Sequence, residues 1–291
     1  MPFGIKFGVG GIPEEREKEE EVFGGEAEEL LEERAARRPT YDVPFVPVRV
    51  SDFDKLIEKG GVEKGTNFLL SGGCGTGKST FAMQSIYNGL LAGEKAVYIL
   101  FEESDEKIKR HMRVNFGWDL EKFEKLDRLA ILRINPFKIA RSVEASLVKQ
   151  RRALLIQVEQ LELPFVPDKI VVDSLSALSV AFMGNTENYR YYIKHMFDSL
   201  NQYDSINFII SETEQDPGIY SRTGIEEFLA DGVIVLYNVK VGMTRKRMLE
   251  ILKLRCSNHV KTLVPYNITP KGIAIEYDAS KTALEEIGVR K

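Results

Sequence analysis

The most informative part of the sequence is Gly72-Gly73-Cys74-Gly75-Thr76-Gly77-Lys78-Ser79, or GGCGTGKS at residues 72–79. It fits the pattern G-x-x-x-x-G-K-[ST] of a phosphate-binding loop. The residues before it, NFLLS, are apolar and suit a buried strand, and those after it, STFAMQSIYNGLL, suit a helix. Because the motif and both flanks agree, the sequence predicts a nucleotide-binding loop between a strand and a helix.

The residue types in this loop match the chemistry of a nucleotide's phosphates. Its glycines let backbone N–H groups turn inward around the β- and γ-phosphates, and the following helix adds the positive end of its dipole. We expect Lys78 to bridge phosphate oxygens and the Ser79 hydroxyl to ligate Mg²⁺. The competing interpretation is a glycine-rich turn that only caps a helix. The predicted nucleotide-binding residues are Gly73, Cys74, Gly75, Thr76, Gly77, Lys78, Ser79 and Thr80.

From Tyr41 onward, short apolar runs alternate with longer amphipathic stretches. This pattern is typical of βαβ units, and it predicts an α/β fold with a mainly parallel central sheet and helices on both faces. The predicted strands are Asn67–Ser71, Ala96–Phe101, Leu129–Ile134, Lys169–Asp173, Asn207–Ser211 and Val233–Tyr237. The predicted helices are Lys78–Leu91, Asp105–Phe116, Ile139–Gln160 and Asn188–Gln202.

The order of elements changes after Val233. The runs Val233–Asn238, Arg247–Arg255 and Ile273–Tyr277 follow one another through short turns that leave no room for helices. Strands joined in this way pair antiparallel. The sequence therefore predicts an antiparallel C-terminal extension at one edge of the sheet.

Charge is distributed unevenly along the 291 residues. The net charge is −4, but residues 11–38 hold eleven Glu against five Lys or Arg, a local −6 that leaves +2 for the rest. We therefore expect an acidic, mobile arm at residues 1–40, followed by one core domain at residues 41–291. The arm is either a solvated tail or a helix that docks a protein partner.

Composition also excludes several classes of protein. A hydrophobic content of 43% is typical of a globular chain, not a disordered one. The two cysteines are too few for a disulfide framework and have no Cys/His cluster nearby that would form a zinc site. The N-terminus lacks an apolar secretory stretch, and no run approaches the ~18 apolar residues of a membrane span. We expect a cytoplasmic protein without membrane insertion.

Acidic residues end two of the predicted strands. The run Lys169–Asp173 has the form of a Walker B element, so we expect Asp173 to hold Mg²⁺ through water at the carboxyl edge of the sheet. Glu102 and Glu103 follow another strand, and one of them can activate the attacking water. Which of the two is the base stays open, and an acid-rich helix start is the competing interpretation.

Several motifs together resemble the KaiC-like branch of the RecA/RadA ATPases. They are GGCGTGKST, FEES, VVDSLSAL, SRTGIEEFLADGVIVL, LEILKLRCSNHV and PYNITPKGIAI. The resemblance runs from about Phe53 to Tyr277 and leaves the acidic arm outside. It implies a single RecA-like P-loop core of the archaeal, single-domain kind. It further implies that ATP and Mg²⁺ bind between adjacent subunits of a homo-oligomer, commonly a hexameric ring.

The resemblance also assigns candidate residues to the reaction. Glu102 and Glu103 become the catalytic glutamate pair. Lys253 and Arg255 match the Lys-x-Arg that reaches a neighbouring subunit's nucleotide, and His259 matches a position near that nucleotide. The competing interpretation is a solvated edge strand for the two cations and a structural role for the histidine.

Strand spacing gives independent support for the two cations. In LEILKLR, alternation predicts one face that changes from apolar to cationic, made by Leu249, Ile251, Lys253 and Arg255. The polar stretch Ser211–Gln215, which ends another strand, is either a γ-phosphate sensor or a plain turn.

Three functions fit these observations. The first is an oligomeric, Mg-dependent ATPase with slow turnover and a regulatory or signalling role. The second is an ATP-binding scaffold with negligible hydrolysis, and the third is a RadA-like DNA-binding ATPase. The pI near 5.7 argues against DNA, although the acidic arm accounts for much of that value. Autokinase activity is not implied, since Gly218–Asp231 resembles the non-phosphorylated type.

Overall fold

The computed structural model describes residues 44–150, 163–214, 220–221 and 223–277. The predicted acidic arm lies outside these residues, as does the predicted helical stretch beyond Gln150. Within the described ranges, no helix combines the length and apolar character that crossing a bilayer demands.

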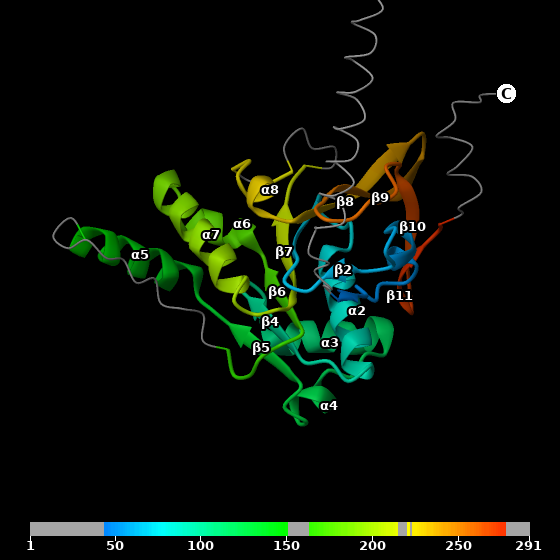
Figure 1. Ribbon diagram of the computed structural model, residues 1–291, viewed down its shortest axis with the longest axis horizontal. Helices are drawn as coiled ribbons and strands as arrows, with labels where there is room; N and C mark the ends of the chain where they lie inside the picture. Colours follow the sequence, from blue (N-terminus) through cyan, green and yellow to red (C-terminus); the bar gives the residue numbers. More distant parts are fainter. Residues whose placement is uncertain (1–43, 151–162, 215–219, 222, 278–291) are drawn as a thin grey trace, which may run out of the picture. The chain divides into compact units, whose positions relative to one another are not determined.

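A nine-stranded sheet forms the centre of the fold, in the order β11-β10-β9-β8-β3-β7-β6-β4-β5 (Figure 1). The strands from β8 to β5 pair in parallel, whereas β8–β9, β9–β10 and β10–β11 pair antiparallel. The predicted α/β fold with an antiparallel extension is therefore confirmed. The strands are β3 (Asn67–Gly72), β4 (Ala96–Leu100), β5 (Leu129–Arg133), β6 (Lys169–Asp173), β7 (Ile206–Glu212), β8 (Gly232–Val241), β9 (Thr244–Leu254), β10 (Val264–Thr269) and β11 (Gly272–Ile275).

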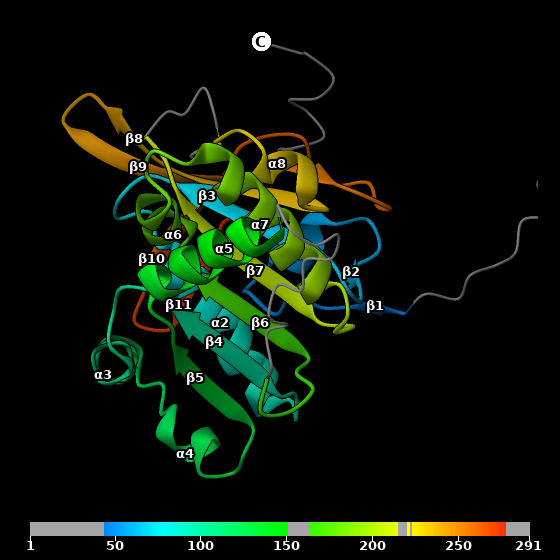
Figure 2. The same cartoon turned by 90° about the vertical axis from the view of Figure 1, so that its left-hand side faces the viewer.

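Helices cover both faces of this sheet. Figures 1 and 2 show α5, α6 and α7 on one face, with α2 and α3 on the other. The first group is α5 (Pro136–Gln150), α6 (Leu175–Ala181) and α7 (Thr186–Leu200), and the second is α2 (Lys78–Leu91), α3 (Asp105–Phe116) and α4 (Glu121–Glu124). Short elements complete the fold: β1 (Phe45–Val46), η1 (Phe53–Leu56), β2 (Val62–Glu63) and α8 (Glu226–Leu229).

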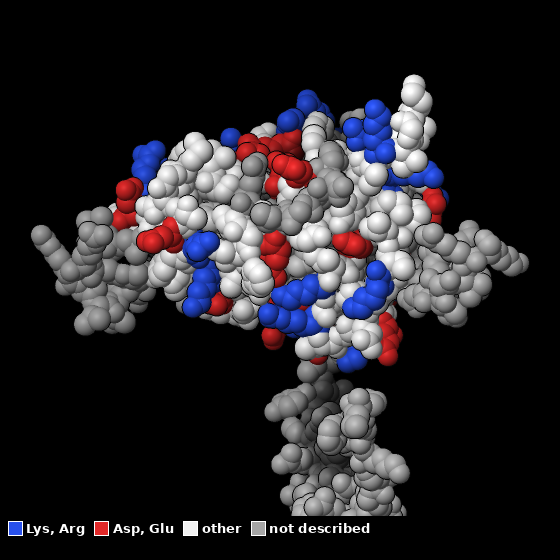
Figure 3. All heavy atoms as spheres, turned by 90° about the horizontal axis from the view of Figure 1, so that it is seen from above, with Lys and Arg blue, Asp and Glu red and all other residues white. Residues whose placement is uncertain are grey.

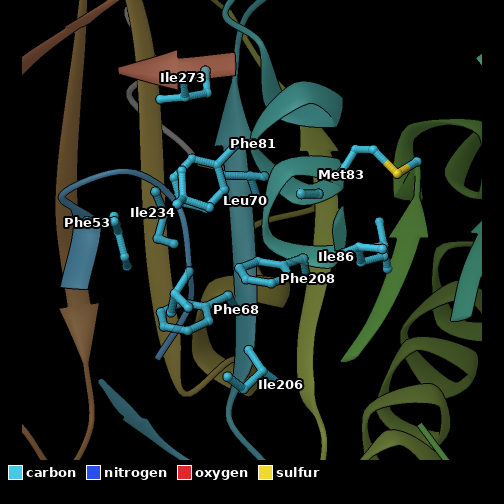
Figure 4. Packing of buried hydrophobic residues seen from close by; sticks show 14 of the residues in the cluster. Phe53, Phe68, Leu70, Phe81, Met83, Ile86, Ile206, Phe208, Ile234 and Ile273 are labelled. Atoms are coloured by element: carbon cyan, nitrogen blue, oxygen red, sulfur yellow. The ribbon is translucent and has the colours of Figure 1, made fainter. Parts of the chain in front are cut away.

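Alternation along the buried strands divides the core into two layers. In β4, Tyr98 belongs to the cluster on the α2 face, whereas its neighbours Val97 and Ile99 belong to the cluster on the α5–α7 face. Figure 4 shows part of the first cluster, where Phe68 of β3 stacks on Phe208 of β7 with ring centroids 5.7 Å apart. Both layers are anchored on β3, which carries the phosphate-binding loop at its carboxyl end.

Gly232 opens β8 where the strand touches Phe68. A Cβ atom at this position would lie 2.3 Å from Cε1 of the Phe68 ring, and that ring is fully buried. We expect Gly232→Ala to lower the free energy of unfolding by about 1–3 kcal/mol, the usual cost of overpacking a dense core. Urea-induced unfolding of both proteins measures this difference in the free energy of unfolding. In a Phe68→Leu background the same change should cost clearly less, and strictly additive losses would contradict the proposed clash.

The C-terminal extension contains one strand more than the predicted runs. β8 and β9 form a long hairpin, as predicted, and β11 follows. The additional strand is β10, which has the sequence VPYNIT. A proline within an apolar run argues against a central strand. Because β10 contains Pro265, the sequence pattern did not predict this strand.

A β-bulge overturns the predicted face of β9. Ile234 pairs with Ile251, but its neighbour Val233 pairs with Lys253, which leaves Leu252 as an extra residue. Adjacent residues of β8 point to opposite faces, so Lys253 lies on the opposite face from Ile251. The prediction that one face is shared by Leu249, Ile251, Lys253 and Arg255 is therefore wrong, because Lys253 lies on the other face from Ile251.

Candidate functional site

The predicted phosphate-binding loop joins the carboxyl end of β3 to the first residue of α2. Gly75 and Gly77 have φ of 73° and 92°, a region that favours glycine. A Cβ on Gly77 would lie 2.7 Å from Cδ1 of Ile268 in β10. Tyr266 of the same strand donates a hydrogen bond to the carbonyl of Thr76. The C-terminal hairpin thus packs directly on the loop and holds its backbone.

Lys78 is held inside this loop. Its Nζ donates to the carbonyl oxygens of Gly72 and Gly73 at 3.0 and 2.9 Å, and the residue is only 7% exposed. Burial lowers the pKa of the Lys78 amine, and the carboxylates of Glu212 and Asp173 oppose that shift. The amine therefore lies inside the loop, where the phosphates of a nucleotide are predicted to bind.

The two residues predicted to hold Mg²⁺ are in contact. The Ser79 hydroxyl, in the first turn of α2, donates to Oδ2 of Asp173 at the end of β6, with 2.8 Å between the oxygens. Burial raises the pKa of Asp173, while hydrogen bonds from Tyr98 and Ser79 and the charge of Lys78 lower it. The arrangement brings a hydroxyl and a carboxylate together beside the loop.

This donor set fits magnesium. Mg²⁺ prefers hard oxygen ligands, and beside phosphates it usually takes only one or two from the protein. Within the described residues, no group of three or more His, Cys, Asp or Glu side chains could hold a metal alone. Ser79 and Asp173 thus suit a cation whose remaining ligands come from a nucleotide and water.

Glu102 and Glu103 lie just beyond the carboxyl end of β4 but differ in their surroundings. Glu103 forms an ion pair with Lys107, 2.9 Å away, and its carboxylate is 3.8 Å from Nδ1 of His111, both on α3. Glu102 is exposed, and partial desolvation together with the charges of Glu212 and Asp173 raises its pKa. Glu102 also lines a cavity of about 530 Å³ beyond the ends of β4 and β5.

Lys253 and Arg255 lie at the opposite end of the sheet from the phosphate-binding loop of the same chain. Lys253 Nζ donates to the carbonyls of Glu227 and Ala230 at the end of α8, at 3.0 and 2.6 Å. Arg255 pairs with Asp231 at 3.0 Å. These contacts are local to α8 and the start of β8.

Strand register places these two cations. Gly232 pairs with Leu254 on one side and with Phe68, near the start of β3, on the other. The loop follows Gly72, four residues further along, which is about 13 Å at the usual rise of a strand. The structure therefore does not bring Lys253 and Arg255 to the loop of the same chain.

His259 has contacts of its own. It is 9% exposed and forms a backbone bridge with Ile57, and its Nε2 lies 3.0 Å from Nζ of Lys261. Burial and the nearby Lys261 lower its pKa. Within one chain, these contacts are those of a structural histidine.

The predicted sensor stretch begins where expected, at the carboxyl end of β7. Ser211 pairs with Ser71 of β3, and Glu212 pairs with Gly72. Ser211 Oγ is buried and has no hydrogen-bond partner among the described residues. Gln215 lies outside the described residues. The stretch thus places polar groups beside the first residue of the loop.

Two site residues were missed by sequence reasoning. Arg247 of β9 donates from Nε to the carbonyl of Gly75 in the loop, at 3.4 Å. Tyr98 of β4 donates to Asp173 at 2.7 Å. Neither lies in a local motif, because each reaches the site from a strand whose pattern only indicates core or edge.

The carboxyl edge of the parallel sheet carries a strand followed by a glycine loop, a buried lysine and a hydroxyl–carboxylate pair. This arrangement defines a RecA-like P-loop protein that binds nucleotides. A family model described as ATPase: KaiC matches residues 46–280. The chain belongs to the KaiC family of ATPases.

Known relatives agree with this membership. The circadian clock oscillator protein KaiC of Acaryochloris marina is 32% identical over 235 residues, which are 80% of this chain and 44% of that protein. KaiC of Synechococcus elongatus is 32% identical over 227 residues, 78% of this chain and 43% of that protein. The chain thus spans less than half the length of these curated relatives.

A solved structure is also similar. The crystal structure of a KaiC-like protein from the hyperthermophilic archaeon Pyrococcus horikoshii superimposes with a TM-score of 0.66 at 33% sequence identity. The match covers 81% of this chain and 100% of that one. The likeness to a single KaiC-like domain confirms the predicted RecA-like core.

Proposed function

We propose that the protein binds Mg²⁺ and ATP at residues 72–79 and hydrolyses ATP slowly in a regulatory role. The observation that carries this proposal is the 2.8 Å contact between Ser79 Oγ and Asp173 Oδ2, beside the buried Lys78. Membership of an ATPase family supports the choice of nucleotide.

Each residue of the site has a role in this proposal. The loop's N–H groups and Lys78 bind the phosphates, and Ser79 and Asp173 hold Mg²⁺, Asp173 through water. The metal supplies positive charge that neutralises the phosphates. Glu102 accepts the proton of the attacking water, because Glu103 is already paired with Lys107.

The proposal includes self-association. Lys253 and Arg255 are too far from their own loop, so they serve a nucleotide bound to a neighbouring copy, and the active form is an oligomer. A hexameric ring agrees with the family resemblance. His259 lies beside these residues in sequence and belongs to the same proposed contact. A cytoplasmic location and a protein partner for the acidic arm stay predictions.

Loss of the serine hydroxyl tests the metal site. We expect Ser79→Ala to lower Mg-dependent phosphate release about 10- to 100-fold, because a direct ligand of the cation is lost. Nucleotide binding measured in EDTA should be unchanged. Ser199→Ala, a partly exposed serine on α7, is the matched control and should behave like wild type.

The same measurement separates the enzyme from the scaffold. Phosphate release is followed on the assembled wild-type protein with Mg²⁺ and with EDTA. Release that Mg²⁺ does not stimulate would contradict the proposed site. ATP binding without any release would favour the scaffold.

DNA binding gains no support from the described residues. In the face shown in Figure 3, basic and acidic side chains are interspersed. Tyr192 of α7, an aromatic side chain of the kind that can stack on a base, packs on Phe182 with 5.7 Å between ring centroids, and burial raises its pKa to about 12. The segment after β7, residues 216–226, lies partly outside the described residues. Fluorescence anisotropy with single-stranded DNA and ATP at physiological salt tests this alternative.

A further inference from the structure

Tyr98 lies at the boundary between the hydrophobic core and the proposed magnesium site. It is the middle residue of β4, a strand whose five residues, AVYIL, are all buried, and Tyr98 itself is 0% exposed. Its ring packs in the cluster on the α2 face, while its hydroxyl donates to Oδ2 of Asp173 at 2.7 Å. The ring belongs to the core and the hydroxyl belongs to the site.

Strand register explains how the hydroxyl reaches the carboxylate. Tyr98 pairs with Val171 of β6, and Leu100 pairs with Asp173, so Tyr98 and Asp173 are diagonal neighbours on one face of the sheet. Long aromatic side chains reach across such diagonals. The contact is therefore set by two adjacent central strands and not by a loop.

The two donors to Asp173 meet at a single atom. Ser79 Oγ and the Tyr98 hydroxyl both donate to Oδ2, at 2.8 and 2.7 Å. The hydrogen bonds that the described residues make to this carboxylate all end on Oδ2. Fixing one oxygen from two directions sets the rotation of the carboxylate, and with it the direction of Oδ1.

We propose that Tyr98 is a positioning residue that sets how tightly the site holds Mg²⁺, by fixing the carboxylate of Asp173. This inference rests on the proposed function, since it assumes that Asp173 serves the metal. The Tyr98 hydroxyl does not touch nucleotide in this account. It acts through Asp173, which itself holds the metal through water in the proposed site, as outer residues of metal sites commonly do.

A purely structural role makes a different prediction. If the tyrosine only fills the core, then phenylalanine, which keeps the ring, should be equivalent at this position except for stability. If the hydroxyl positions Asp173, the metal requirement must change even though the ring still packs. Metal affinity and core stability can be measured separately.

The test compares Tyr98→Phe with wild type in full-length protein. Binding of a non-hydrolysable ATP analogue is titrated with Mg²⁺, and separately measured in EDTA. We expect the Mg²⁺ concentration for half-maximal binding to rise about tenfold, the lower end of the usual effect of outer partners. Affinity in EDTA should not change, and kcat at saturating Mg²⁺ should stay within about twofold of wild type. An unchanged Mg²⁺ titration would overturn the inference.

Tyr237→Phe is the matched control. Tyr237 also donates to a carboxylate, that of Glu250 in β9, but its ring packs on the opposite face of the sheet from Tyr98, so loss of its hydroxyl should leave the Mg²⁺ titration unchanged. A similar shift in both variants would show a general effect of destabilisation and overturn the inference.

A double-variant cycle tests whether Tyr98 acts through Asp173. In an Asp173→Ala background, Tyr98→Phe should no longer shift the Mg²⁺ titration, whereas an undiminished shift would contradict the proposed route. Wild-type protein that binds the analogue equally well with and without Mg²⁺ would instead refute the metal site itself. The failure of the proposed function is thereby distinguished from the failure of this inference.

Discussion

Glu102→Gln should lower phosphate release about 10²- to 10⁴-fold, the usual contribution of a general base, while ATP binding stays within about twofold of wild type. Glutamine keeps the size of the side chain but cannot accept a proton from water. Glu102 lies just beyond the end of β4, where partial desolvation and the charges of Glu212 and Asp173 raise its pKa, which suits a proton acceptor. Single-turnover phosphate release and a fluorescent nucleotide titration measure the two effects.

Glu103→Gln is the matched control because it changes the adjacent carboxylate in the same way. Glu103 is engaged with Lys107 and His111 of α3, so its loss should weaken a helix contact and cost less than about tenfold in rate. A larger loss for Glu103→Gln than for Glu102→Gln would reverse the two assignments. Equal and negligible losses would remove both residues from the reaction.

Arg255→Ala should lower phosphate release about 10³-fold or more, which is the scale of an arginine supplied to a phosphoryl group. In its own chain Arg255 pairs with Asp231, at the opposite end of β3 from the loop. The effect should therefore depend on assembly, and ATP binding by the variant should persist. Arg113→Ala removes a comparable exposed pair, between Arg113 of α3 and Asp119 after the end of that helix, and should leave the rate unchanged.

Mixing two inactive variants tests whether Arg255 works in a neighbouring copy. Arg255→Ala subunits keep an intact loop, and Lys78→Ala subunits keep an intact arginine. In an equal mixture that assembles at random, about one quarter of the contacts between copies join an intact loop on one copy to an intact Arg255 on the next, so activity should partly return. Activity that stays at the level of the separate variants would place Arg255 outside the reaction or within its own chain.

Sequence patterns predicted the parts of the site that are local in the chain. The loop, the strand before it and the helix after it form one continuous stretch, and the strand ending at Asp173 has its own apolar signature. Because the carboxyl ends of parallel strands share one edge, finding Asp173 and Ser79 in contact required only the fold class. The sequence could equally place Glu102 and Glu103 at that edge.

Features that depend on pairing between distant strands were not predictable. The bulge at Leu252 interrupts an alternation that looks continuous in LEILKLR, and it moves Lys253 to the other face. Tyr98 reads as a core residue, since a diagonal neighbour on another strand leaves no trace in local periodicity. The sequence indicates only that Arg247 is a cation on an edge strand, and its contact with the loop appears only once the position of β9 is known. In each case register, which one strand alone does not specify, decided the outcome.

The separation of the loop from Lys253 and Arg255 along β3 has a consequence for the proposed assembly. A site completed in this way joins two different patches, so the contact is heterologous and every copy faces its neighbour in the same direction. An open row of copies then always ends in one loop that no arginine reaches, whereas a closed ring has none. In the proposed oligomer, closure into a ring is therefore the step that gives every subunit a complete site.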